Sequence, residues 1–200
     1  MTSCLQKAAL KRRSRYGFEK KIPISDKELQ NILEQALLNT PSAFNSQSTR
    51  AVLLLGKHHK RLWEITKDIL LKKIGQERFE KTREKIDESF LSGYGTILFF
   101  EDQDTVRHLQ ENFKSYKDKF PQWSQHTSGM HQYVVWTALA EAGIGASLQH
   151  YNPLIDQAVI DQWDINPSWT LISQMPFGIA TDTPDEKTFE PLEKRLKVFQ

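Results

Sequence analysis

The apolar residues of this chain follow two kinds of pattern, helical spacing and short continuous runs. Spacing of three to four residues predicts amphipathic helices, which we place at residues 3–11, 25–40, 57–73, 76–90, 106–120, 130–142 and 153–160. Continuous apolar runs predict buried strands, which we place at residues 51–56, 94–100 and 170–180, with a last short strand at 197–199. Helices and strands therefore mix along the chain, which has no internal repeat.

The clearest helix start lies at Ser25. Ser25 and Glu28 have the spacing of a capping box, and Ile24 and Leu29 stand at the two positions of a hydrophobic staple. Pro41 stops the helix, because proline cannot continue a helical hydrogen-bond ladder. We therefore expect the helix to deliver the chain directly into the polar segment that follows.

The predicted helix at 130–142 is apolar on most of its sides. Such a helix belongs at the centre of a core, and the same pattern also suits a dimer interface. Gly143 and Gly145 end it, and a Gly-x-Gly turn lets the backbone approach a ligand closely. The polar stretch just before it, 124–129, is either a mobile, substrate-facing lid or an ordinary surface connection.

Two residues restrict the last long strand, 170–180. Pro176 has no N–H to donate to a sheet, so we expect it at an edge or a bulge. Gly178 suggests a close backbone contact. A polar, acidic loop follows the strand at 181–190.

Composition sets limits on the class of protein. A chain of 200 residues suits one domain with a sizeable core. Its net charge of +2 gives no sign of a nucleic-acid partner, and no apolar run approaches the roughly 20 residues that span a bilayer. The single cysteine, Cys4, excludes an internal disulfide framework. With no signal-peptide pattern after Met1, we expect a cytoplasmic protein.

Three consecutive polar side chains, Asn45, Ser46 and Gln47, lie between the helix at 25–40 and the strand at 51–56. Their amide and hydroxyl groups offer donors and acceptors that suit a flat, polar heterocycle. A polar loop between a helix end and a buried strand is a common place for a binding site. The alternative is an ordinary turn, since Pro, Ser, Asn and Gln also favour turns.

Two cationic clusters lie near opposite ends of the chain. Their members are Arg12, Arg13 and Arg15 with Ser14, and Lys194, Arg195 and Lys197. Guanidinium groups match phosphate oxygens, and a serine hydroxyl adds a short donor. The alternative is a pair of exposed charge runs.

Several other kinds of chemistry find no support in the sequence. No Gly-x-Ser-x-Gly elbow of a hydrolase and no phosphate-binding Walker loop is present. The histidines, His58, His59, His126, His131 and His150 among them, have no recognised metal-ligand spacing, so we expect no metal site.

Five segments carry a resemblance to the FMN-dependent nitroreductase family. They are RRSR at 12–15, PSAFNSQ at 41–47, GIGASL at 143–148, QMPFG at 174–178 and PLEKR at 191–195. They occur in the family's order and span nearly the whole chain. The stretch QHYNP at 149–153 is similar to the subgroup named after fatty-acid repression mutants, which includes copper-induced bacterial nitroreductases.

This resemblance implies one FMN-binding domain over residues 1–200 with an α+β fold, a central and mainly antiparallel sheet surrounded by helices. It also implies a homodimer in which a C-terminal segment reaches the partner chain. The implied FMN-binding residues are Arg12, Arg13, Ser14, Asn45, Ser46, Gln47, Gly145, Leu148, Lys194 and Arg195. Which of Lys194, Arg195 and Lys197 would hold the phosphate stays open.

The implied activity is a ping-pong reduction. NADH or NADPH would reduce FMN and leave, and a nitroaromatic, a quinone or a similar small acceptor would then be reduced. The flavin performs this chemistry, so we name no catalytic side chain. Two alternatives remain: a flavin-binding regulator or sensor of lipid or metal stress with little turnover, and an α+β protein without a cofactor.

Overall fold

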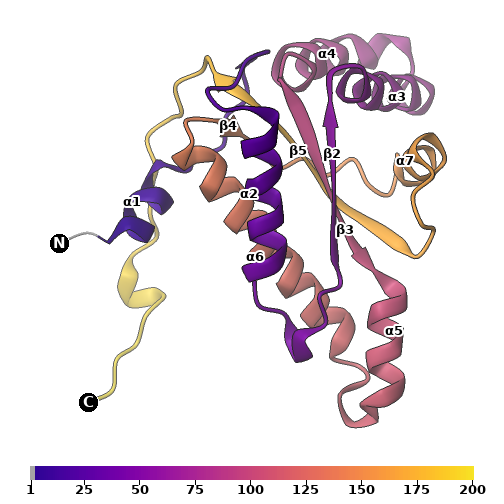
Figure 1. Ribbon diagram of the computed structural model, residues 1–200. Coiled ribbons are helices and arrows are strands. Elements are labelled where there is room, and N and C mark those ends of the chain that lie inside the picture. Colours follow the sequence, from indigo (N-terminus) through magenta and orange to yellow (C-terminus); the bar gives the residue numbers. More distant parts are fainter. Residues whose placement is uncertain (1–2) are drawn as a thin grey trace.

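The computed structural model describes residues 3–200, and its centre is an antiparallel sheet (Figure 1). Its strands are β1 (Phe18–Glu19), β2 (Thr49–Leu55), β3 (Gly95–Asp102), β4 (Gly145–Ala146) and β5 (Trp169–Ala180). They pair in the order β1-β5-β3-β2, and β4 also pairs with β5. All of these pairings are antiparallel. The predicted α+β fold with a central antiparallel sheet is therefore confirmed.

Helices cover both faces of the sheet (Figure 1). They are α1 (Cys4–Lys11), α2 (Asp26–Asn39), α3 (Gly56–Ile74), α4 (Gln76–Ile86), α5 (Gln103–Asn112), α6 (Phe120–Glu141) and α7 (Asp156–Trp163). Helices α2 and α6 pack on one face, and α3, α4 and α7 pack on the other. Within residues 3–200, no helix combines the length and apolarity needed to cross a membrane.

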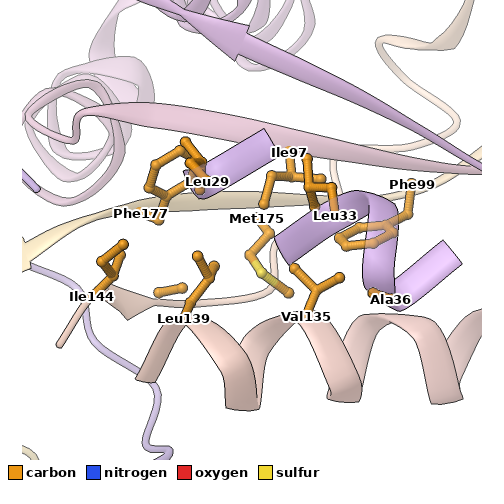
Figure 2. Close-up of a cluster of buried hydrophobic side chains, with 11 residues drawn as sticks. Leu29, Leu33, Ala36, Ile97, Phe99, Val135, Leu139, Ile144, Met175 and Phe177 are labelled. Carbon is orange, nitrogen blue, oxygen red and sulfur yellow. The ribbon is translucent and has the colours of Figure 1, made fainter. Parts of the chain in front are cut away.

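Strand β3 is buried along its whole length because both of its faces are covered. Ile97 and Phe99 point into the cluster formed with α2 and α6, which Figure 2 shows. Leu98 and Phe100 point to the opposite side, toward α3 and α7. This two-sided burial explains why the strand reads as a continuous apolar run instead of an alternating one.

Helix α2 begins as the sequence predicts. The Ser25 hydroxyl accepts a hydrogen bond from the Glu28 N–H at 3.2 Å, and the Glu28 carboxylate accepts one from the Ser25 N–H at 2.8 Å. The helix ends at Asn39, just before Thr40 and Pro41. It delivers the chain to a short 3₁₀ turn at Ala43–Asn45, and β2 follows.

The prediction of a connection or mobile lid at 124–129 is wrong, because this stretch lies inside α6. Pro121 stands in the first turn of the helix, where a missing N–H costs nothing. The Ser124 hydroxyl donates to the Pro121 carbonyl at 3.1 Å, and the Thr127 hydroxyl donates to the Trp123 carbonyl at 3.0 Å. Hydroxyls satisfied within the helix in this way can be buried, as Ser124 and Thr127 are.

The expectation of an edge or a bulge at Pro176 is also wrong: β5 is an inner strand, Pro176 pairs with Thr96 of β3, and the register shift of that pairing lies between Phe99 and Phe100. The Pro176 carbonyl accepts from the Ser147 N–H at 3.3 Å, so its missing N–H faces the same side. On that side Pro176 lies between the end of β4 and an isolated bridge from Gln149 to Gln174. The close contact at Gly178 is confirmed, since a Cβ there would lie 2.6 Å from the Glu19 carbonyl oxygen.

Several other element boundaries also differ from the prediction. Helix α5 starts early, because the Asp102 side chain caps it by accepting from the Asp104 N–H at 3.0 Å. It ends at Asn112, and a 3₁₀ turn covers Lys114–Tyr116. Helix α7 starts at Asp156 instead of Pro153. No strand forms at 197–199, which lies in an exposed C-terminal segment.

Candidate functional site

The polar loop after α2 has an unusual backbone. Phe44, Asn45 and Gln47 have φ values of 56°, 51° and 49°, in the left-handed region that residues other than glycine rarely occupy. Such conformations persist only where neighbouring groups hold them, and they concentrate at functional sites. The Asn45 and Gln47 side chains are exposed, so their amide groups are available to a ligand.

Buried polar groups hold the end of this loop. Ser48 and Thr49 donate from their hydroxyls to the two carboxylate oxygens of Glu101, at 2.6 and 2.5 Å. The Glu101 side chain is fully buried, and burial raises the pKa of its carboxyl group. Next to it, Arg50 forms an ion pair with Asp102 at 2.8 Å. The sequence prediction missed these residues, although two acids directly after a buried apolar strand were the available signal.

Five aromatic side chains gather beside the loop. The Phe44 ring lies 4.7 to 6.1 Å, between centroids, from the rings of Phe113, Tyr116, Phe120 and Trp123. Phe44, Phe113 and Tyr116 are largely exposed, whereas Phe120 is buried. The cluster therefore presents an open aromatic surface next to Asn45, which sequence reasoning did not predict because its members come from three separate elements.

The N-terminal basic segment lies against the turn after α6. Ser14 forms a parallel bridge with Ala146, and the Arg15 N–H donates to the Ala146 carbonyl at 3.0 Å. Gly145 is part of the same contact, since a Cβ there would lie 3.1 Å from the Arg15 Cγ. The structure thus brings together Ser14 and Gly145, which the sequence analysis named separately.

The three N-terminal arginines differ in their contacts. The Arg12 guanidinium lies 4.4 Å above the Trp136 ring, and its buried Nε has no hydrogen-bond partner in the part of the chain that the structure describes. Arg13 donates to the Asp185 carbonyl at 2.5 Å, and Arg15 pairs with the Asp182 carboxylate at 2.8 Å. A cavity of about 380 Å³ lies between this segment and the acidic loop. Arg12 is therefore better placed than Arg13 to receive an anion.

The loop and the basic segment lie far apart within one chain. Phe44 stacks on Trp123 near the start of α6, and Arg12 stacks on Trp136 near its end. Thirteen residues separate these tryptophans in α6, and a helix rises about 1.5 Å per residue, so the two contacts are roughly 20 Å apart. Figure 1 shows the same separation, with the loop at the lower end of α2 and the basic segment beside β4.

The remaining candidates divide between core and surface. Leu148 packs against the cluster between the sheet and α2 and α6. Lys194 and Arg195 lie in the exposed C-terminal segment, which runs away from the sheet in Figure 1. The Lys194 ammonium lies 3.9 Å from the Glu190 carboxylate. Both cations are thus open to solvent in one chain.

An antiparallel sheet between helices, a partly buried arginine whose Nε has no partner within residues 3–200, and a separate loop of exposed amides fit the class of cofactor-binding oxidoreductases. Comparison with known proteins narrows this class. Residues 9–179 match the model of the Nitroreductase family. The chain is 35% identical to the nitroreductase FRM2 of Saccharomyces cerevisiae over 184 residues, 91% of both chains. It is 36% identical to the putative nitroreductase HBN1 of the same yeast, covering 94% of this chain and 93% of that protein.

A solved structure agrees with these sequence relatives. The nitroreductase CinD of Lactococcus lactis, in complex with 4-nitrophenol, superimposes with a TM-score of 0.87 at 39% identity, covering 98% of this chain and 100% of that one. The same protein has also been solved with chloramphenicol. This chain belongs to the nitroreductase family, and the resemblance seen in its sequence is confirmed.

Proposed function

We propose that this protein is an FMN-dependent NAD(P)H oxidoreductase that reduces nitroaromatic, quinone or similar small acceptors. One observation supports FMN binding in particular: within residues 3–200 the buried Arg12 Nε has no hydrogen-bond partner, and it lies in the segment whose Ser14 meets the β4 turn. A buried donor without a partner is costly, and an anionic group would satisfy it. The relatives named nitroreductase and the CinD complex with 4-nitrophenol support the same activity.

The residues that would bind FMN form two groups, one for its phosphate and one for its ring system. Arg12 and Ser14 would hold the phosphate, and Gly145 would keep the adjacent backbone free of a side chain. The exposed side chains of Asn45 and Gln47, with Ser46, would bind the polar edge of the ring system. FMN, when bound, would supply the hydride and electron transfer, so the protein's part is binding and orientation.

A second copy of the chain would bring these two groups together. Because they lie roughly 20 Å apart along α6, a single flavin would take one group from each chain of a homodimer. An apolar cavity of about 460 Å³ between α1 and α6, lined by Leu5, Tyr133 and Val134 among others, supports burial of this face. The donor, NADH or NADPH, would enter the same site.

The C-terminal segment suits exchange between the two chains. Its apolar side chains are largely exposed in one chain: Leu192, Leu196, Val198 and Phe199. Strand β2 forms an edge of the sheet, and an edge offers unpaired backbone groups to another segment. The tail of one chain would lie on the other and carry Lys194 and Arg195 toward its partner's site.

The aromatic cluster around Phe44 would form one wall of the acceptor site. Its exposed rings adjoin the loop that would bind the flavin edge, and flat acceptors stack well on aromatic rings. Such a wall would also keep water from the reacting atoms.

The test is a pair of double variants. Asn45→Ala with Gln47→Ala should abolish tight FMN binding and NAD(P)H-dependent acceptor reduction. The control, Gln35→Ala with Asn39→Ala, removes two exposed amides that bond to each other on α2 and should leave both properties unchanged. Full flavin occupancy in the first variant would contradict the ring assignment. Tight FMN binding without turnover in the unaltered protein would indicate a regulator instead.

A further inference from the structure

Hydrogen bonds at Gln47 hold the backbone of the loop that would bind the flavin edge. Gln47 is neither glycine nor asparagine, yet its φ is 49°, a backbone conformation that such a residue rarely keeps unaided. Its N–H donates to the Ser42 hydroxyl at 3.0 Å within the same loop. Its carbonyl, by contrast, accepts from Arg50 Nη1 at 2.6 Å, which links the loop to the strand that follows.

Arg50 is itself fixed by the end of β3. Its Nη2 donates to the Asp102 carboxylate at 2.8 Å, and the Asp102 N–H donates to the Ser48 carbonyl at 2.9 Å. The Asp102 carboxylate also accepts from the hydroxyls of Thr105 and Ser168. The guanidinium therefore connects the carbonyl of a strained residue to a carboxylate that three other groups hold in place: the two hydroxyls and the Asp104 N–H that it caps.

Glu101 supplies a second anchor directly beside this one. Its buried carboxylate receives the hydroxyls of Ser48 and Thr49, the two residues between Gln47 and Arg50. A buried carboxylate with two short hydroxyl donors fixes both residues, because losing either donor would leave one buried carboxylate oxygen without a partner. Ser48, Thr49 and Arg50 are thus tied directly to the last two residues of β3, and Gln47 is tied to them through Arg50.

We propose that Arg50 is a positioning residue of the flavin site, acting with Glu101 to hold Gln47 in its left-handed conformation so that the Asn45 and Gln47 amides face the ligand. This rests on the proposed function, which assigns those amides to FMN. Arg50 contacts no part of the proposed site except through the Gln47 carbonyl, so its effect on FMN passes through that residue.

The experiment compares FMN binding and the visible flavin spectrum of Arg50→Met with those of Lys67→Met. Lys67 also forms a partly buried ion pair, with Asp87 at 2.5 Å, but far from the loop, so it controls for the general loss of an ion pair. We expect FMN binding to weaken roughly tenfold or more in Arg50→Met, with an altered flavin spectrum, and to stay unchanged in Lys67→Met. Arg50→Lys, which keeps one donor, should recover part of the loss.

A double-mutant cycle tests whether the effect passes through Gln47. In a Gln47→Ala background, Arg50→Met should weaken FMN binding much less than it does alone. Equal FMN binding in Arg50→Met and Lys67→Met, or losses that simply add in the cycle, would overturn the inference. Should Arg50→Met fail to fold, Glu101→Gln takes its place under the same criteria, because it keeps the shape of the buried side chain.

These outcomes separate this inference from the proposed function. If the unaltered protein does not bind FMN, the proposed function fails. If it binds FMN and loses it in the Asn45→Ala, Gln47→Ala double variant but not in Arg50→Met, only the positioning role fails.

Discussion

Gly145 has no room for a side chain. A Cβ at this position would lie 2.7 Å from the Ala180 Cβ and 3.1 Å from the Arg15 Cγ. We therefore expect Gly145→Ala to destabilise the protein by about 1 to 3 kcal/mol, since neither neighbour can move without disturbing a strand or the basic segment. Thermal denaturation measures the change.

Gly129 provides the matched control. It lies on the exposed side of α6 with nothing within 4 Å of an added Cβ. Gly129→Ala should therefore stabilise the protein by about 0.5 to 1 kcal/mol, because alanine favours a helix interior. Equal melting temperatures for the two variants would show that the backbone approach at Gly145 is not close.

Because His59 is buried, we expect the protein to lose stability in mild acid. Its ring is 3% exposed, with Nδ1 2.9 Å from the Thr96 hydroxyl and Nε2 3.3 Å from the Leu91 carbonyl. Burial is the main cause that lowers the pKa of His59 from 6.5 to about 4. Between these values the unfolded chain takes up a proton that the folded protein does not. The free energy of unfolding should therefore fall by up to about 3 kcal/mol as the pH drops from 6.5 to 4.

Urea titrations of a His59→Gln variant at several pH values test this assignment. The variant should lose less stability than the unaltered protein between pH 6.5 and 4, whatever its stability at neutral pH. His126→Gln, which removes an exposed histidine, should follow the unaltered protein. An unchanged pH dependence in His59→Gln would contradict the account.

At the scale of elements, the sequence predicted helix α2 well and the start of α6 poorly. The signals that begin α2 are local, namely a capping box, a staple and a following proline. The first half of α6 has no such pattern, because Ser124, Thr127 and Ser128 occupy its buried side. Ser124 and Thr127 donate to carbonyls within the helix, and the Ser128 hydroxyl accepts from the Gln132 side chain. Their burial depends on these bonds and on packing that only the assembled fold supplies.

The capping box at the start of α2 leads to a prediction about stability. Ser25→Ala removes the hydroxyl that accepts from the Glu28 N–H, which should cost about 1 kcal/mol of stability. Ser92→Ala is a suitable control, because that exposed hydroxyl only donates to a helix carbonyl and should change stability by less than about 0.5 kcal/mol. If chemical denaturation gives the two variants equal stability, the capping box contributes nothing.

At the scale of the whole molecule, the sequence supplied some members of the candidate site but not their arrangement. The resemblance named Ser14 and Gly145, which meet in the structure, and Asn45 and Gln47, which lie roughly 20 Å from that contact along α6. A pattern of residues does not tell whether distant segments meet within one chain or between two. Glu101 was missed because acids after a strand usually face solvent, whereas this one is buried by the loop it holds.

Removal of residues 190–200 tests the proposed exchange between chains. The shortened protein should shift toward the monomer in analytical ultracentrifugation and bind FMN more weakly, because exposed Leu196 and Phe199 no longer contact a partner. A variant with Leu196→Ser and Phe199→Ser keeps the full chain length. It should also shift toward the monomer and bind FMN more weakly. If both variants dimerise as tightly as the unaltered protein, the C-terminal segment does not hold the two chains together.

The most direct test of the central claim is the visible spectrum of the purified protein with FMN, recorded before and after anaerobic addition of NADH or NADPH. We predict bound-flavin absorption that bleaches with at least one of the two donors and returns when a nitroaromatic or quinone is added, because bound FMN carries the hydride. The absence of bound flavin, even with added FMN, would contradict the proposed function.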